Sequence, residues 1–499
     1  MIAAFALAHA HANAQPAVPT IPEILLREGD VIAGITIHSI NRVSINTDGE
    51  WLATVNLSGS SVPAVIRSGR LHFKAGDALA GANGAIDSWG AANIAPDGST
   101  LWPITSTVRA GVYRTLRDEP PAVPAFVAGS NAYTPARWLT APRVITLDMN
   151  TALVIGSVDD LAILGSDDAG IFALTVDAQG VQSLVAPLIR ETNLIGFGTP
   201  PTNIPLASVW TGAAHSDASS LTAYAWMGLL AFPASDATNE IAMLGRFGVL
   251  AREGGVSVSP SRTYAPMTSN AISVNASGDW AMRVALSGTV GGNAAIIRNG
   301  AAFARKGEVF AAKPQYFIDQ LTSQGPPIHI DDFARVWWWC DYSAADLTAD
   351  CAIVCNSTIV LNEGQRVGTT EFIQTFRTTN TSFAIDPLGR HLLCVVTLVG
   401  GVDALVRVSP PRPPEGARCS PADIADDEGT ALPSPGVNNG VTEGDYNAFF
   451  SWFFDALPAC DIAADDATPL PPFGEPTAPN NGVTEADYNL FFGRFFDGC

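Results

Sequence analysis

The chain has 499 residues, of which 47% are hydrophobic and only 15% are charged, so it is long enough to form two or three domains with buried cores. Its formal net charge is −21, and residues 419–499 carry −13 of it, from 14 acidic residues and one arginine. This concentrated negative charge argues against nucleic acid as a partner, because phosphate contacts need Lys and Arg, and it favours hard cations, which prefer carboxylate oxygens.

The first fifteen residues have features of a secretory signal. Ile2 to Ala10 are apolar, and Ala12-Asn13-Ala14 gives a small-residue cleavage pattern before Gln15, although a basic segment at the start is missing. We therefore expect residues 1–15 to be a signal-peptide remnant and the protein to be secreted or displayed at the cell surface. No other stretch is apolar for long enough to span a bilayer.

Residues 16–408 contain short β-rich runs and a recurrent turn motif, N/D-x-x-G, followed by alternating apolar residues. Tight turns before half-buried strands have this pattern. The copies begin at Ile45, Ile94, Val274 and Ile385.

A second motif is a short apolar run that ends in a charged turn. Seven copies begin 43 to 73 residues apart, at Leu25, Phe73, Leu116, Ile189, Leu250, Ala304 and Leu361. This spacing suits four-stranded blades. We predict a mainly β chain with a seven-bladed β-propeller; six blades, or a pair of β-sandwiches, are the alternatives.

The order of the two motifs predicts how the propeller closes. The first charged-turn copy, at Leu25, has no N/D-x-x-G copy before it, and the last N/D-x-x-G copy, at Ile385, has no charged turn after it. An N-terminal strand that completes the last blade would account for both and would remove the open sheet edges.

Few residues of the propeller suggest chemistry. His329 is the one histidine beside paired acids, Asp331 and Asp332, and it is a weak candidate for a metal or catalytic site. The run 337–339 is three consecutive tryptophans, which on a strand would face alternate sides; such residues stack on sugars or, more commonly, pack between blades. The seven cysteines all lie after residue 339, and export makes disulfides plausible without fixing their pairing.

Residues 409–418 are a Pro-rich linker, and residues 419–499 contain a duplication. The string N-N-G-V-T-E-G-D-Y-N-A-F-F ends at Phe450, and N-N-G-V-T-E-A-D-Y-N-L-F-F ends at Phe492. Each copy follows an acidic segment, here called the acidic lead, which is D-I-A-D-D from Asp423 in the first copy and D-I-A-A-D-D from Asp461 in the second. Each copy also begins a helix with an apolar face. In an EF-hand loop, oxygen ligands come from positions 1, 3, 5, 7, 9 and 12. Counted back from position 12, the first copy has Asp445, Thr442, the Gly440 carbonyl and Asn438 at positions 12, 9, 7 and 5, and the second has Asp487, Thr484, Gly482 and Asn480. Position 3 is Ala425 or Ala463, so the other ligands predicted for the two calcium ions are Asp423 and Asp461 at position 1, helped by Asp427 and Asp465.

This duplication resembles the dockerin family, and more narrowly the GC-type dockerin-like domain at the C-terminus of exported bacterial proteins. The resemblance covers residues 419–499 and implies a small α-helical, EF-hand-type domain that binds a cohesin-like or cell-surface anchoring protein. The propeller loosely resembles secreted bacterial proteins with N-x-x-G-x-x-A-F-type repeats. The chain departs from the dockerin loop in that about ten residues separate each acidic lead from N-N-G, and Asn439 and Asn481 stand where the loop has glycine.

These features together predict a secreted, non-catalytic β-propeller that binds a glycan or protein and is anchored by a calcium-stabilised, dockerin-like tail. One alternative is an extracellular polysaccharide-degrading enzyme with a propeller catalytic domain. Another is a cell-surface structural protein whose tail is a sorting signal.

Overall fold

The computed structural model describes residues 22–408 with gaps, and shorter parts of the tail. The longer gaps are 59–61, 80–83, 117–120, 161–166, 191–193, 198–201, 215–223, 231–239, 258–261, 267–271, 288–292 and 322–327. In the tail it describes 422, 424–425, 441–455, 457, 460–463 and 482–495. The signal segment 1–15 and the linker 409–418 therefore lie outside the described residues.

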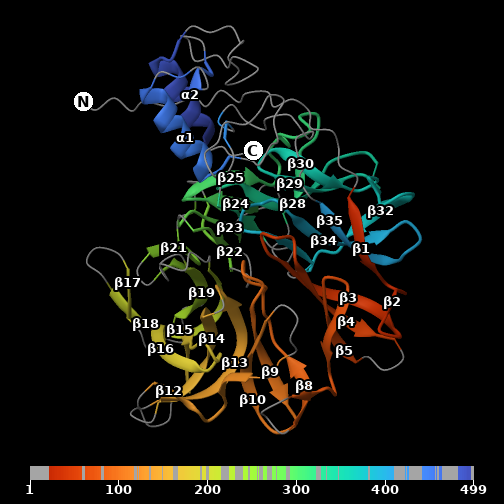
Figure 1. Ribbon diagram of the computed structural model, residues 1–499, viewed down its shortest axis with the longest axis vertical. Coiled ribbons are helices and arrows are strands. Elements are labelled where there is room, and N and C mark those ends of the chain that lie inside the picture. Colours follow the sequence, from red (N-terminus) through yellow and green to blue (C-terminus); the bar gives the residue numbers. More distant parts are fainter. Residues whose placement is uncertain are drawn as a thin grey trace. The chain divides into compact units, whose positions relative to one another are not determined.

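Residues Ile21–Val408 form one compact unit, in which seven antiparallel sheets follow one another around a ring in chain order (Figure 1). The chain is a seven-bladed β-propeller, and the six-bladed alternative is wrong.

The first four blades have five strands each. Blade 1 is β2 (Val31–Ile32), β3 (Ile35–Ile45), β4 (Trp51–Leu57), β5 (Pro63–Arg67) and β6 (Arg70–Lys74). Blade 2 is β7 (Ala78–Leu79), β8 (Gly84–Trp89), β9 (Thr100–Ser106), β10 (Ala110–Thr115) and β11 (Val123–Val127). Blade 3 is β12 (Asn131–Tyr133), β13 (Ala136–Thr146), β14 (Thr151–Asp160), β15 (Asp167–Val176) and β16 (Gln182–Arg190). Blade 4 is β17 (Leu194–Phe197), β18 (Thr202–Ala214), β19 (Tyr224–Leu230), β20 (Glu240–Leu244) and β21 (Gly248–Arg252).

The last three blades vary in their innermost strands. Blade 5 is β22 (Ile272–Val274), β23 (Trp280–Ala285), β24 (Ala294–Arg298) and β25 (Ala301–Arg305). Blade 6 is β26 (Ile318–Gln320), β27 (His329–Ile330), β28 (Val336–Tyr342), β29 (Cys351–Cys355) and β30 (Thr358–Asn362). Blade 7 is β31 (Arg366–Val367), β32 (Glu371–Phe376), β33 (Phe383–Ile385), β34 (Leu392–Leu398) and β35 (Asp403–Val408), with β1 (Glu23–Arg27) at its outer edge.

The N-terminal strand closes the ring. β1 pairs antiparallel with β35, with Glu23 opposite Arg407, and the Arg407 guanidinium lies 2.6 Å from the Glu23 carboxylate. The strand and the turn that follow Leu25 therefore belong to blade 7, as the motif order predicts. β35 has no open edge, because β1 occupies the position of its missing neighbour.

The charged-turn motif is only partly a marker of the outer strands. Six of its seven copies end the outer strand of a blade, but the copy at Leu116 follows β10, the fourth of the five strands of blade 2. The outer strand β11 ends instead at Ala128-Gly129-Ser130, which carries no charge. Gly129 has φ +83°, close to the +93° of Gly29 and the +91° of Gly76 in two charged copies. A glycine in the left-handed region is common to these three turns, whereas charge is not, although the Ile189 copy, I-R-E-T, has no such glycine.

Seven apolar cores, one at each interface between neighbouring blades, hold the described ring together. Successive residues of a strand point to opposite faces of its sheet, so each strand supplies two cores. In β19, Trp226 packs toward blade 3, while Ala225 and Met227 pack toward blade 5. Both faces of a blade are therefore buried, and polar side chains concentrate in the turns.

The N/D-x-x-G motifs form the turns that precede β4, β9, β23 and β34, and two of the four also lock one blade to the next. The Asn46 Oδ1 atom accepts the Glu50 N–H at 2.9 Å, and its Nδ2 donates to the carbonyl of Ala95 in blade 2 at 3.3 Å. Asn275 repeats this arrangement: it accepts the Asp279 N–H at 2.8 Å and donates to the carbonyl of Asp331 in blade 6 at 2.9 Å.

The tail is a separate compact unit with two short described helices, α1 (Glu443–Phe454) and α2 (Glu485–Phe495). Phe449 and Phe491, at equivalent positions of the duplicated sequence, stack with their centroids 3.9 Å apart and their rings 8° from parallel. Both are fully buried. Among the described residues, no helix meets the length and hydropathy needed to cross a membrane.

Removing side-chain volume from β1 tests the closure of the ring. Leu26 is 2% exposed and packs in the core between blades 7 and 1, whereas Val31 is 64% exposed just beyond the strand. Leu26→Ala should lower the free energy of unfolding by about 2–4 kcal/mol because it leaves a cavity, and Val31→Ala should change it by less than about 0.5 kcal/mol. Equal small effects in urea denaturation would contradict a stabilising role for β1.

Candidate binding site

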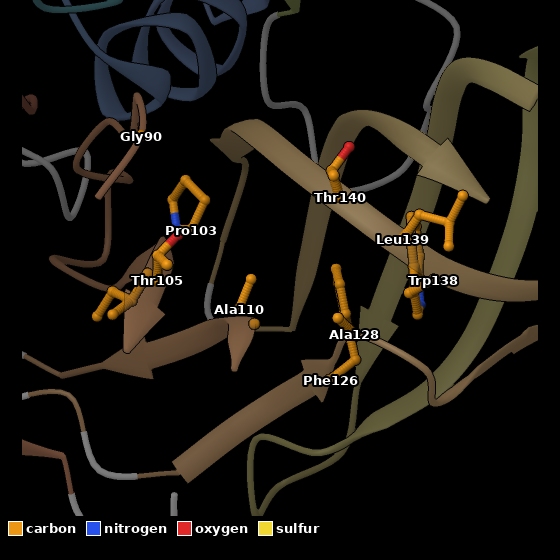
Figure 2. Close-up of a pocket in the computed structure, with 11 residues that line it drawn as sticks. Gly90, Pro103, Thr105, Ala110, Phe126, Ala128, Trp138, Leu139 and Thr140 are labelled. Carbon is orange, nitrogen blue, oxygen red and sulfur yellow. The ribbon is translucent and has the colours of Figure 1, made fainter. Parts of the chain in front are cut away.

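A pocket of about 250 Å³ lies between blades 2 and 3 (Figure 2). The end of β9 and the start of β10 contribute to it. The pocket therefore lies on the face of the propeller that carries the β9–β10 turn and the corresponding turns of the other blades. Its lining is mostly apolar, with two threonines: Gly90, Pro103, Ile104, Thr105, Ala110, Gly111, Phe126, Ala128, Trp138, Leu139 and Thr140. The size suits one ring or one side chain, since pockets for drug-sized ligands are about 300–1,000 Å³.

The wall of this pocket is rigidly packed. The Trp138 ring stacks on Phe126 at 4.2 Å and meets Phe172 edge-on at 5.2 Å, and its Nε1 donates to the Gln182 side chain at 2.8 Å. Gly111 permits the close approach of the strands, because a Cβ there would lie 2.7 Å from the Phe126 carbonyl oxygen. The pocket is therefore preformed, and none of the described residues that line it has an ionisable side chain. No motif of the sequence indicates this pocket.

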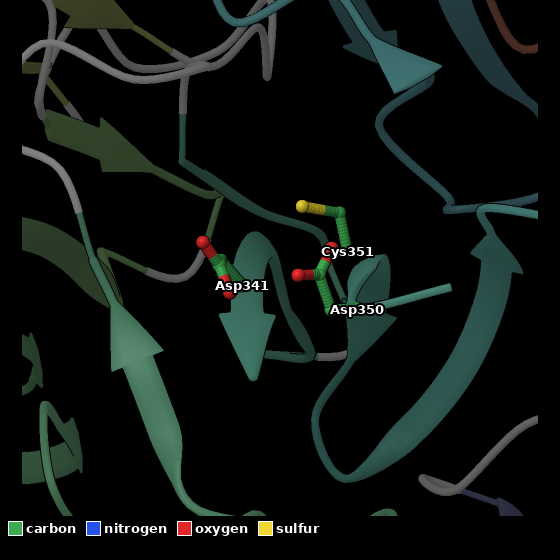
Figure 3. Close-up of side chains that lie close together, drawn as sticks. All are labelled: Asp341, Asp350 and Cys351. Atoms are coloured by element: carbon green, nitrogen blue, oxygen red, sulfur yellow. The ribbon is translucent and has the colours of Figure 1, made fainter. Parts of the chain in front are cut away.

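A cluster of polar side chains lies in blade 6, at the turn between β28 and β29, which corresponds to the β9–β10 turn of blade 2. Ligand-type atoms of Asp341, Asp350 and Cys351 all lie within 4.8 Å of one another (Figure 3). Asp341 and Cys351 are opposite each other in the paired strands. Glu363, which follows β30, is 3% exposed and accepts the Cys351 N–H at 3.3 Å.

Burial and neighbouring acids raise the pKa values of two carboxyl groups in this cluster. Burial, with the charges of Asp350 and Asp319, raises the pKa of Asp341 to about 6. Burial, followed by contacts with Asp350, raises the pKa of Glu363 to about 7. Burial and the neighbouring acids also raise the pKa of the Cys351 thiol, so it stays protonated and unreactive.

In the structure, His329 and its acidic neighbour Asp331 have packing and hydrogen-bonding partners within the fold. Burial lowers the pKa of His329 to about 4, and its ring meets Phe383 edge-on at 4.9 Å. Asp331 is buried, and its Oδ2 accepts from Arg335 Nε at 2.8 Å and from Trp337 Nε1 at 2.7 Å. Arg335 continues to the carbonyl of Leu388 in blade 7 at 2.9 Å. These contacts join blades 6 and 7.

The three tryptophans alternate in facing, as predicted. Trp338 packs in the core between blades 5 and 6, and Trp337 and Trp339 pack in the core between blades 6 and 7. All three are buried, so they form inter-blade packing and offer no platform for a sugar. Cys340 and Cys351 lie on neighbouring strands, but Cys340 is opposite Ala352, and the five described cysteines are free thiols.

Of the twelve residues predicted to bind calcium, six are described. Asp423, Asp427, Asn438, Gly440, Asp465 and Asn480 lie outside the described residues. Thr442 and Thr484 precede α1 and α2, and each accepts a backbone N–H of its helix, from Gly444 and Ala486, at 3.2 Å.

The acids at position 12 already have donors from the chain. Asp445 and Asp487 are fully buried three residues after those threonines, and both carboxylates accept backbone N–H groups. Asp461 accepts the Gly482 N–H at 3.1 Å. The described residues thus do not fit a loop whose position-12 carboxylate binds the ion.

The comparisons with known proteins give no family. No protein-family description and no curated protein matches the chain. A puromycin hydrolase shares 14% identity over 72% of this chain and 50% of its own, with a TM-score of 0.35. The α-L-arabinanase of Penicillium chrysogenum complexed with arabinobiose shares 10% identity over 66% and 96%, with a TM-score of 0.31.

A third structure, the N-terminal domain of Nup159, shares 10% identity over 78% of this chain and 97% of its own, with a TM-score of 0.30. The chain spans about half the length of the puromycin hydrolase. Scores this low carry no argument about function.

His329 should make the propeller sensitive to acid. The unfolded chain takes up a proton at about pH 6.5, whereas folded His329 resists protonation until about pH 4, so stability is lost as the pH falls through this window. By pH 4.5 the loss should reach about 2 kcal/mol. His329→Phe should remove that part of the pH dependence of the unfolding free energy, and His38→Gln, at an exposed histidine, should leave it unchanged. Parallel profiles for wild type and His329→Phe would refute the assignment.

Proposed function

We propose that the propeller is a non-catalytic binding module that takes one ring or side chain of a glycan or protein ligand into the pocket between blades 2 and 3. The observation that carries this proposal is the pocket lining, in which the partly exposed Leu139, Ala110 and Ala128 supply apolar surface beside the hydroxyls of Thr105 and Thr140. Sugar rings and many side chains combine an apolar face with polar edges, and such a lining complements both.

We further propose that the tail is a dockerin-like anchor of an exported protein. This rests on the sequence resemblance and on apolar side chains that α1 and α2 leave exposed. Phe454 is 78% exposed, Tyr446 37% and Tyr488 38%. Exposed aromatic residues at this density suit a protein partner, such as a cohesin-like or cell-surface protein.

The acidic group of blade 6 favours a second candidate, an extracellular polysaccharide-degrading enzyme. Carboxyl groups with raised pKa values, such as Asp341 and Glu363, can act as general acids. Release of soluble sugars from a polysaccharide by the wild-type chain, lost in Glu363→Gln, would favour this enzyme over the binding module.

A glycan array probed with the full-length protein tests the binding proposal. We expect binding to one class of glycan, and Ala128→Phe, which fills the pocket, should weaken it at least about tenfold. Ala301→Phe, at an exposed position on the outer strand of blade 5, is the matched control and should bind like wild type. Glycan binding that survives Ala128→Phe would remove the pocket from the proposal, and absence of binding to any glycan would restrict it to protein ligands.

A further inference from the structure

Each acidic lead of the tail is tied to a helix by one buried aspartate. In the first copy, Asp445 Oδ1 accepts the N–H groups of Ile424 at 2.5 Å and Ala425 at 2.7 Å. Its Oδ2 accepts the Thr442 N–H at 2.7 Å, and the Thr442 hydroxyl lies 3.4 Å away. The four lone-pair sites of this carboxylate are therefore all directed at donors of the chain.

The second copy repeats the arrangement. Asp487 Oδ1 accepts the N–H groups of Ile462 at 2.6 Å and Ala463 at 2.7 Å. Its Oδ2 accepts the Thr484 N–H at 2.7 Å and lies 3.2 Å from the Thr484 hydroxyl. Twenty-odd residues separate each aspartate from its lead, so the two contacts are long-range and equivalent.

These contacts occupy the atoms that a calcium loop would give to the ion. A position-12 carboxylate binds calcium with both oxygens. Here both oxygens of each aspartate are buried against N–H groups, and charge-assisted hydrogen bonds of this kind are about twice as strong as neutral ones. A cation at either place would have to displace two or three of them.

We propose that the tail folds without metal, held by two aspartate clasps in which the N–H groups of Ile424 and Ala425, and of Ile462 and Ala463, stand in the place of the cation. The clasp joins lead and helix directly, which is the role that the ion plays in a calcium loop. This inference goes beyond the proposed anchoring function, and its failure would leave that function untouched.

Asp461 tests the alternative, in which a cation binds to the tail. Its Oδ2 accepts the Gly482 N–H, but its Oδ1 is buried without a hydrogen-bond partner. A cation would use this oxygen, whereas in a metal-free tail it is an unfavourable buried charge. Asp461→Asn keeps an acceptor for Gly482 and removes the charge. It should therefore be harmless or stabilising if no metal binds, and harmful in calcium if metal binds.

Hydrogen exchange followed by mass spectrometry on the full chain can read α1 and α2 separately from the propeller. We expect the backbone N–H groups of both wild-type helices to be equally protected from exchange in about 2 mM calcium and in EDTA. Asp445→Asn should lower the protection of α1, and Asp487→Asn that of α2, by about tenfold or more in both conditions, because a buried N–H pair loses its charged acceptor.

Glu443→Gln and Glu485→Gln are the matched controls, since they remove the same charge from the same helical turns at exposed positions, and they should leave protection unchanged. The proposal is overturned if calcium raises wild-type protection threefold or more and Asp461→Asn abolishes that gain. It is also overturned if Asp445→Asn and Asp487→Asn behave like their glutamate controls. The wild-type comparison decides even if an aspartate variant does not fold.

Discussion

Burial of both faces of every sheet is the constraint on which the rest of this propeller depends. When both faces of a sheet pack against neighbouring blades, the side chains along each strand are buried. They are then not available to bind a ligand or to react. The run Trp337-Trp338-Trp339 illustrates this, because its members go to two different cores and none stays at the surface. Polar and reactive groups are thereby confined to the strand ends and turns.

The two sets of turns then have different roles. On one side of the ring, Asn46, Asn275 and Arg335 use their side chains to reach the neighbouring blade, and Asp331 holds Arg335 in place. Asp331 also explains a glycine, because a Cβ at Gly389 would lie 2.3 Å from its Oδ2. On the opposite side, the turns leave room for the pocket near Trp138 and for the acidic group around Asp341. The pocket and the acidic group thus lie on one face of the ring, and these blade-to-blade hydrogen bonds lie on the other.

The repeat and the closure of the ring could be predicted from the sequence, because both depend on short turn motifs that neighbouring residues determine. A turn that needs an Asx side chain and a glycine is visible as N/D-x-x-G, and an unmatched Leu25 copy predicts a strand shared across the termini. The pocket could not be predicted, because it depends on how β9, β10 and β13 approach one another and on the absence of a side chain at Gly111. The copy at Leu116 was misleading because charge accompanies the turn without causing it.

Burial is the other quantity that a linear pattern does not give. His329 beside two aspartates reads as a candidate ligand set, yet burial lowers the pKa of its ring and keeps it neutral. Asp445 and Asp487 likewise match position 12 of a calcium loop in spacing, and only the three-dimensional arrangement brings the backbone of the leads to them. Spacing identifies which groups can meet, and packing determines what they meet.

The pairing of β1 with β35 also sets the order of events during synthesis. Glu23 and its partner Arg407 are 384 residues apart, so the first strand to be made is the last to find its place. Six blades can form while β1 waits, but the seventh stays incomplete and exposes an unpaired edge. In a concentrated population of nascent chains, that edge can accept β1 from another molecule. Pairing of β1 with β35 of the same chain covers this edge and leaves no site there for a strand of another copy.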